Sequence, residues 1–267
     1  MGRGRALFIQ AWHFLATLKK RCAAFAHFQE TQAELTSLRQ EVQALKEESR
    51  IDNLTKLPNE RAFYELAQRS FAEATRENFE IVSAMSGHPL KAIAIFAIDI
   101  DNFKKVNDEF GGHEAGNKVL VNIADAMRET FHRTVDVRAR LHGDELAALI
   151  CEDGDKIFEV AEKMAENLRA AIERRAPNAH EKIGTASIGV AIIIPIASDV
   201  EYIADALKRA DDAAYTSKGE GRNRVHIMDS NGIIYPSRLN PDYAVISGTR
   251  PTHGNPAPQA APFSPAG

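Results

Sequence analysis

Two pairs of acidic side chains stand beside apolar stretches of this sequence. Asp99 and Asp101 end one apolar run, and Asp144 and Glu145 precede another, Leu146–Ile150. Short apolar runs of this kind are typical of buried strands. An isolated aspartate at a strand end is more often a turn or capping residue, but two such pairs supply the carboxylate ligands that Mg²⁺ prefers. The pattern therefore predicts a divalent-metal site that handles phosphates.

The elements that must position these acids follow from the periodicity of the chain. Strand-like segments at 135–139 and 146–150 flank a short turn at Gly143, which predicts a β-hairpin with acids at its tip. Further elements are expected as strands at 92–98, 182–194 and 224–228, and as helices at roughly 60–79, 103–107, 114–131, 155–175 and 200–218. A hairpin mixed with helical crossovers predicts an α+β fold, with a central mixed antiparallel sheet flanked by helices.

Composition and charge exclude several classes of protein. Hydrophobic residues make up 44% of the 267-residue chain and charged residues 26%, as in ordinary globular proteins. A net charge of -4 gives no nucleic-acid signature, so no nucleic-acid partner is expected. Cys22 and Cys151 fit neither a metal nor a disulfide spacing, which indicates a cytoplasmic protein.

Three segments outside the predicted domain at 52–228 have distinct characters. Residues 1–27 combine basic side chains with a short apolar run. This segment is a helix that packs on a protein partner, a helix on the inner membrane surface, or a signal-type segment. Residues 28–51 carry an a/d seam and predict a parallel dimeric coiled coil, the alternative being a single helix lying on its own domain. Residues 229–267 hold seven of the eleven prolines and are expected to be disordered.

Five motifs now give the domain a family resemblance. In chain order they are Asp52-Asn53-Leu54-Thr55-Lys56-Leu57-Pro58-Asn59, Asp99-Ile100-Asp101-Asn102-Phe103-Lys104-Lys105-Val106-Asn107-Asp108, Gly112-His113-Glu114-Ala115-Gly116-Asn117, Arg140-Leu141-His142-Gly143-Asp144-Glu145-Leu146 and Ala210–Arg224. Together they resemble the GGDEF family, the diguanylate cyclases. The resemblance implies a palm like that of nucleotide cyclases, and a homodimer that condenses two GTP into cyclic di-GMP and pyrophosphate.

The resemblance also implies a role for individual residues. Two Mg²⁺ or Mn²⁺ ions per active site would be held by Asp99, the Ile100 carbonyl and Asp144, with Asp144, Glu145 and Lys104 as catalytic residues. Phosphate charge would be met by Lys104, Lys218 and Arg222, as suits cations near developing negative charge. The remaining substrate-binding set is Asn107, His113, Asn117, His142 and Gly143.

A further short motif precedes the hairpin. Arg133-Thr134-Val135-Asp136 is similar to the family's R-x-x-D site for inhibition by product. The resemblance implies that the Arg133 guanidinium grips a guanine edge or a phosphate of cyclic di-GMP.

Four features depart from the family pattern, one of which is an extra glycine in Gly111-Gly112. His142 replaces the first glycine of the signature, Leu146 replaces its phenylalanine, and Asn117 stands where the family has an aspartate that reads guanine. A Cβ at His142 is expected to cost room or backbone freedom. The Asn117 amide suits an adenine edge better than a carboxylate does. The alternatives to a diguanylate cyclase are therefore a mixed cyclic GMP–AMP synthase, a catalytically degenerate GTP- or cyclic di-GMP-binding signalling domain, and a structural dimerisation module.

Overall fold

The computed structural model describes residues 29, 31–42, 45 and 50–240. The chain divides into two units, residues 1–49 and 50–267, and each is described by itself. The elements of the second unit are, in chain order, α2 (Glu60–Ser83), β1 (Lys91–Ile100), α3 (Phe103–Glu109), α4 (Gly112–Thr130), β2 (Val137–His142), β3 (Glu145–Asp153), α5 (Ile157–Glu173), β4 (Ala186–Ile193), α6 (Val200–Gly219), β5 (Val225–Met228) and β6 (Ile234–Pro236).

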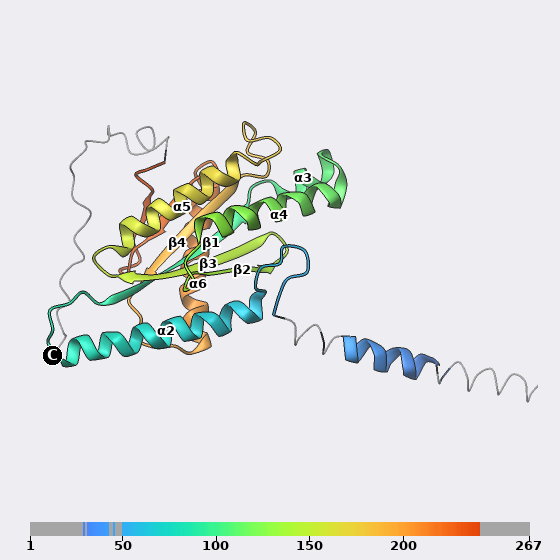
Figure 1. The fold of residues 1–267 in the computed structure, drawn as a ribbon. Helices are drawn as coiled ribbons and strands as arrows, with labels where there is room; N and C mark the ends of the chain where they lie inside the picture. Colours follow the sequence, from blue (N-terminus) through green and yellow to red (C-terminus); the bar gives the residue numbers. More distant parts are fainter. Residues whose placement is uncertain (1–28, 30, 43–44, 46–49, 241–267) are drawn as a thin grey trace, which may run out of the picture. The chain divides into compact units, whose positions relative to one another are not determined.

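A six-stranded sheet forms the centre of the described domain (Figure 1). Its strand order is β2-β3-β1-β4-β5-β6. All neighbouring strands are antiparallel except β4 and β5, which run parallel. The central mixed sheet predicted from the sequence is confirmed.

The core lies on both faces of this sheet. Along β1, Ala94, Phe96 and Ile98 pack into one hydrophobic cluster with α4 and α5, while Ile93 and Ile95 pack into a second with α2 and α6. Figure 1 shows the same layering, with α4 and α5 on one side of the sheet and α2 and α6 on the other. Because both faces are covered, β1 is apolar at nearly every position instead of alternating.

Local signals in the sequence fix several element ends. The Asn59 side chain accepts a hydrogen bond from the Ala62 amide at 3.1 Å and caps α2, and Asp199 caps α6 in the same way through the Tyr202 amide at 2.9 Å. The strand expected from residue 182 begins only at Ala186. Lys182 and Gly184 adopt φ values of 56° and 75°, which interrupt an extended strand.

The folded domain extends beyond the boundary that we expected at residue 228. Strand β6 pairs with β5, and Ser237 and Asn240 are buried. The Arg238 guanidinium contacts the buried Glu162 carboxylate of α5 at 2.8 Å. Disorder was therefore a wrong prediction for residues 229–240, because a proline is tolerated at the edge of a sheet. The rest of the predicted disordered tail, 241–267, lies outside the described residues.

The N-terminal predictions are only partly covered by the structure. Residues 1–27 lie outside the described residues, so the three alternatives for this basic segment remain predictions. Residues 31–42 are helical, and the seam residues Leu35, Leu38 and Val42 have exposed fractions of 40%, 52% and 49%. Within the described part of the chain, no helix is both long and apolar enough to span a membrane.

Candidate functional site

The two predicted acidic clusters meet at one end of the sheet. Asp99, near the end of β1, pairs in register with Glu145 at the start of β3, and Asp144 lies in the adjoining turn. Burial raises the pKa of the Asp99 carboxyl above its ordinary value. Lys218 opposes that effect, whereas the charges of Asp144 and Asp101 add to it. Antiparallel pairing of β1 with β3 thus builds a concentrated negative site from residues far apart in sequence.

In the hairpin turn, the left-handed backbone conformation falls on a glycine. Gly143 has a φ of 53°, whereas His142 is the last residue of β2 and has no positive φ. The expectation that a side chain at position 142 would cost backbone freedom is therefore wrong. The Arg140 guanidinium holds the turn, donating to the Gly143 carbonyl at 2.7 Å and contacting the Asp52 carboxylate at 3.2 Å.

His142 instead contacts an acidic side chain of the turn. Its Nδ1 lies 3.2 Å from a carboxylate oxygen of Glu145. Both side chains remain largely exposed, at 68% and 51%. The imidazole can therefore meet solvent or a ligand while it stays beside a predicted catalytic carboxylate.

A cation approaches the acidic cluster from α6. Lys218 Nζ lies 2.6 Å from Oδ2 of Asp99, and both side chains are only partly exposed. The other oxygen of this carboxylate, Oδ1, is buried without a hydrogen-bond partner. Asp99 therefore presents one neutralised oxygen and one unsatisfied acceptor, which a metal ion or a donor group would satisfy.

The predicted base-binding residue Asn107 is held at the contact of α3 with α4. A Cβ at Gly116 would lie only 2.2 Å from Asn107 Oδ1, so the glycine makes room for this amide. Asn107 Oδ1 is buried and has no hydrogen-bond partner. A nucleobase donor would satisfy it.

Four of the predicted site residues have side chains that do not contact the other site residues through hydrogen bonds or ion pairs. Within residues 50–240, the side chains of Lys104, His113, Asn117 and Arg222 are exposed and make no hydrogen bond or ion pair. Lys104 lies on α3, His113 and Asn117 lie on α4, and Arg222 lies in the turn after α6. Their side chains are available to a ligand.

The R-x-x-D motif borders a separate groove of about 540 Å³ between its own loop and α5. The Asp136 carboxylate accepts from the Arg133 amide at 3.0 Å, and its Oδ1 is buried and without a partner. The Arg133 guanidinium contacts Glu152 at 3.1 Å. Lys163 of α5 and Arg174, which follows that helix, also line this groove, so it is rich in cations.

Comparison with known proteins decides the family. A family model described as "Diguanylate cyclase, GGDEF domain" matches residues 49–224. The chain belongs to the GGDEF domain family. The family predicted from the five motifs is thereby confirmed.

Relatives of this GGDEF domain include several named proteins. The biofilm architecture maintenance protein MbaA of Vibrio cholerae is 34% identical over 201 residues, which cover 72% of this chain and 23% of that protein. Diguanylate cyclase A of Treponema denticola is 34% identical over 149 residues, covering 55% of this chain and 38% of that protein. The chain thus spans well under half the length of these curated relatives.

Solved structures show the same fold. The coiled coil and GGDEF domain of DgcB from Caulobacter crescentus, solved in complex with c-di-GMP, superposes with a TM-score of 0.53 at 27% identity, covering 76% of this chain and 97% of that one. The GGDEF domain of TpbB from Pseudomonas aeruginosa gives a TM-score of 0.51 at 29% identity, covering 74% of this chain and 99% of that one.

Two acids of this GGDEF domain matter more than the sequence indicated. Asp101 is fully buried and accepts hydrogen bonds from the Thr185 and Ser187 hydroxyls, both at 2.7 Å. It is an anchor of the site, and its place in the D-I-D motif was the available signal. Asp211 lies on an exposed part of α6, yet local desolvation and the charges of Glu145, Asp212 and Asp99 raise its pKa to about 6.

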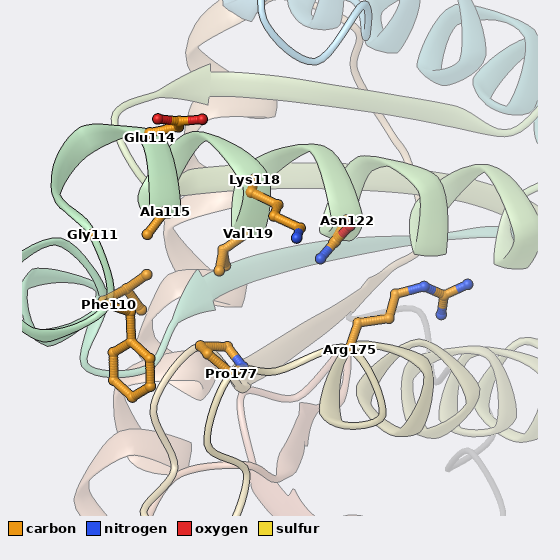
Figure 2. A pocket seen from close by; sticks show the side chains of 10 residues that line it. Phe110, Gly111, Glu114, Ala115, Lys118, Val119, Asn122, Arg175 and Pro177 are labelled. Atoms are coloured by element: carbon orange, nitrogen blue, oxygen red, sulfur yellow. The ribbon is translucent and has the colours of Figure 1, made fainter.

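A second cavity of about 420 Å³ lies apart from the predicted nucleotide residues. Figure 2 shows it between α4 and the chain around Pro177, with Lys118, Asn122 and Arg175 at its rim. It is lined by Val106 of α3 and by Phe110, which follows that helix, and not by Lys104 or Asn107. No motif or periodicity of the sequence predicted this cavity.

Proposed function

We propose that the protein is a diguanylate cyclase, which condenses two GTP molecules into cyclic di-GMP and pyrophosphate as a homodimer. The observation that supports this most is the cluster of Asp99, Asp144 and Lys218, with its 2.6 Å ion pair and the unsatisfied Asp99 Oδ1. Opposed carboxylates with one adjacent cation suit a nucleotide triphosphate and its metal ions. The relatives named diguanylate cyclases support the same reaction.

The acidic cluster fits divalent metal ions. Its donors are all oxygens, and Mg²⁺ in nucleotide sites usually takes one or two carboxylates together with phosphate oxygens and waters. Asp99, the Ile100 carbonyl and Asp144 would hold two Mg²⁺ or Mn²⁺ ions. When bound, the ions neutralise the triphosphate and favour the ionised attacking hydroxyl. Within the described residues, no group of three or more His, Cys, Asp or Glu side chains is arranged to hold a metal.

The side chains around the cluster bind and orient the substrate. Each protomer binds one GTP, and the 3′-hydroxyl of each GTP attacks the α-phosphate of the other, so that two phosphodiester bonds form and two pyrophosphates leave. Lys104, Lys218 and Arg222 stabilise the charge that develops on the phosphates. Glu145, supported by His142, lies beside the attacking hydroxyl, and Gly143 lets the backbone approach the nucleotide. Asn107, with His113 and Asn117, contacts the base.

Product analysis tests this function. Purified protein incubated with GTP and Mg²⁺ is expected to make cyclic di-GMP, and the Asp144→Ala variant to make none. A parallel reaction with GTP and ATP tests the Asn117 substitution, since loss of one hydrogen bond to guanine costs about 1–3 kcal/mol of selectivity. A mixed cyclic GMP–AMP product would establish relaxed purine choice, and absence of any cyclic dinucleotide would overturn the cyclase proposal.

The structure weakens the case for a catalytically degenerate domain. Leu146 is 1% exposed and lies in the main hydrophobic core, so its replacement of phenylalanine concerns packing. His142 imposes no left-handed backbone. If product analysis finds no cyclase activity, binding of GTP or cyclic di-GMP by this domain is the second candidate function, supported by the unsatisfied buried oxygens of Asn107 and Asp136.

We further propose that the coiled coil at 28–51 holds two domains together. The exposed apolar seam residues Leu35, Leu38 and Val42 would be buried against a second copy. A protein shortened to residues 50–240 is then expected to be monomeric and, at micromolar concentration, about 100-fold slower, because it loses the effective concentration that the dimer provides. Light scattering and initial rates across protein concentrations check this. The Leu38→Lys variant of the full chain should likewise be monomeric and slower. Undiminished activity of the shortened protein would contradict the proposal.

The groove beside the R-x-x-D motif is the proposed product site. A guanine N–H would satisfy the buried Asp136 Oδ1, and the Arg133 guanidinium would bind a phosphate or a guanine edge. Arg133→Ala is expected to weaken cyclic di-GMP binding at least about tenfold, as for a lost hydrogen bond to a charged group. Calorimetry measures this, with Arg69→Ala, an exposed arginine on α2, as the control. Equal affinities for the two variants would show that product binds elsewhere.

A further inference from the structure

The turn after α6 has an unusual backbone. Arg222 and Asn223 have φ values of 64° and 48°. Residues other than glycine avoid this left-handed region, and two in succession are costly unless their surroundings hold them. The turn carries Arg222, whose guanidinium is one of the proposed phosphate contacts. The contacts that hold this turn therefore also determine the position of the Arg222 guanidinium.

Asn223 holds this turn through three hydrogen bonds. Its amide N–H donates to Asp101 Oδ2 at 2.9 Å, and its side-chain Nδ2 donates to Glu173 at 2.8 Å. Its Oδ1 accepts from Nη1 of Arg169 at 3.1 Å. The turn is thus fastened both to the segment beside Asp99 and to α5.

Arg169 is the centre of the α5 attachment. Its side chain is 6% exposed, and it donates to Glu166 at 2.7 Å and to Glu173 at 2.8 Å. Burial acts to lower the pKa of Arg169, but the two glutamates raise it above its ordinary value, so the side chain is charged. A planar guanidinium can reach three acceptors at once, which a lysine ammonium on a flexible stem does less well.

We propose that Arg169 is a positioning residue for nucleotide binding, which holds Asn223 and thereby presents the Arg222 guanidinium to the substrate phosphates. This inference rests on the proposed function, because it assumes that Arg222 binds phosphate. Arg169 itself is buried on α5, and its contact with the turn is to Asn223, so it acts through the turn. A purely structural arginine would support the fold without any special dependence on Arg222.

A double-mutant cycle separates these roles. The probe is a non-hydrolysable GTP analogue with Mg²⁺, and its affinity is measured by calorimetry for the full chain, Arg169→Met, Arg222→Met and the double variant. Each single variant is expected to bind about tenfold more weakly. The double variant should bind within twofold of Arg222→Met, because Arg169 has nothing left to position. Arg169→Met combined with Lys104→Met is the control, and its two losses should multiply.

A second variant guards against unfolding, because Arg169→Met leaves the buried Glu166 carboxylate and the partly exposed Glu173 carboxylate without their partner. Asn223→Gly keeps the left-handed backbone and the Arg169 ion pairs, but it removes the side chain that accepts a hydrogen bond from Arg169. It should also weaken binding about tenfold at an unchanged melting temperature. The inference would be overturned if the losses of affinity from Arg169→Met and Arg222→Met multiply in the double variant. It would also be overturned if Asn223→Gly binds the GTP analogue with full affinity. In both cases the cyclase proposal would stand. No binding of the analogue by the full chain would overturn both.

Discussion

Replacement of Asp99 by asparagine is expected to abolish most cyclase activity without weakening the fold. Loss of groups that merely support a metal ligand costs 10- to 100-fold in many enzymes, so loss of a ligand should lower the rate at least about 100-fold. The asparagine also removes the charge that pairs with Lys218 at 2.6 Å. The loss should appear in the rate of product formation at saturating GTP.

The expected stability of Asp99→Asn follows from the pKa of the native carboxyl. Burial, Asp144 and Asp101 raise that pKa above its ordinary value despite Lys218, so the folded protein holds the Asp99 proton more tightly than the unfolded chain does. Stability then falls as the pH rises from the unfolded pKa through the folded one, and the full penalty is present at neutral pH. A neutral asparagine lacks this penalty, and the melting temperature at pH 7 should stay equal or rise.

Asp101→Asn is the matched control for this prediction. It makes the same chemical change two residues along the chain, at a carboxylate that accepts three hydrogen bonds from Thr185, Ser187 and Asn223. An amide nitrogen there meets donors, so the melting temperature should fall. Thermal melts and product assays on both variants distinguish the sites. A marked drop in the melting temperature of Asp99→Asn would show that Asp99 is a structural residue like Asp101.

Most of the fold could be predicted from the sequence because its signals are local. The apolar runs around Asp99 and Leu146 and the glycine at 143 determine strands and a turn by themselves. The acidic pairs could be expected to meet once the strands were placed. The ordered motifs then identified the family, which the family model confirms.

What the sequence left out depends on contacts between distant residues. Nothing near Ile234–Pro236 indicates a strand, because that segment is an edge strand whose partner, β5, sets its conformation. The anchoring role of Asp101 depends on hydroxyls at 185 and 187, more than 80 residues away. The effect of His142 was misjudged for a similar reason, since only the hairpin register shows that the positive φ falls on Gly143.

Among substitutions that add one methyl group near the site, Gly189→Ala should lower the stability of the folded domain the most. Gly189 lies in β4 directly under α6, and a Cβ there would come within 2.0 Å of the Ala210 carbonyl oxygen and 2.1 Å of the Ala214 nitrogen. Both are backbone atoms of a helix, so no side-chain rotation relieves the clash and α6 must move. Overpacking of this kind costs about 1–3 kcal/mol, or about 3–10 °C in the melting temperature of a domain this size.

The matched control is Gly219→Ala, at the last residue of α6. A Cβ at Gly219 meets nothing within 4 Å, so the same methyl group should leave the melting temperature unchanged or raise it. Because α6 also carries Lys218, displacement of the helix by Gly189→Ala should separate the ammonium from Asp99. The loss of cyclase rate should therefore exceed the loss expected from unfolded protein alone, even in assays well below the melting temperature. If Gly189→Ala melts like the parent protein and retains its rate, the close approach of α6 to β4, and with it the placement of Lys218, is wrong.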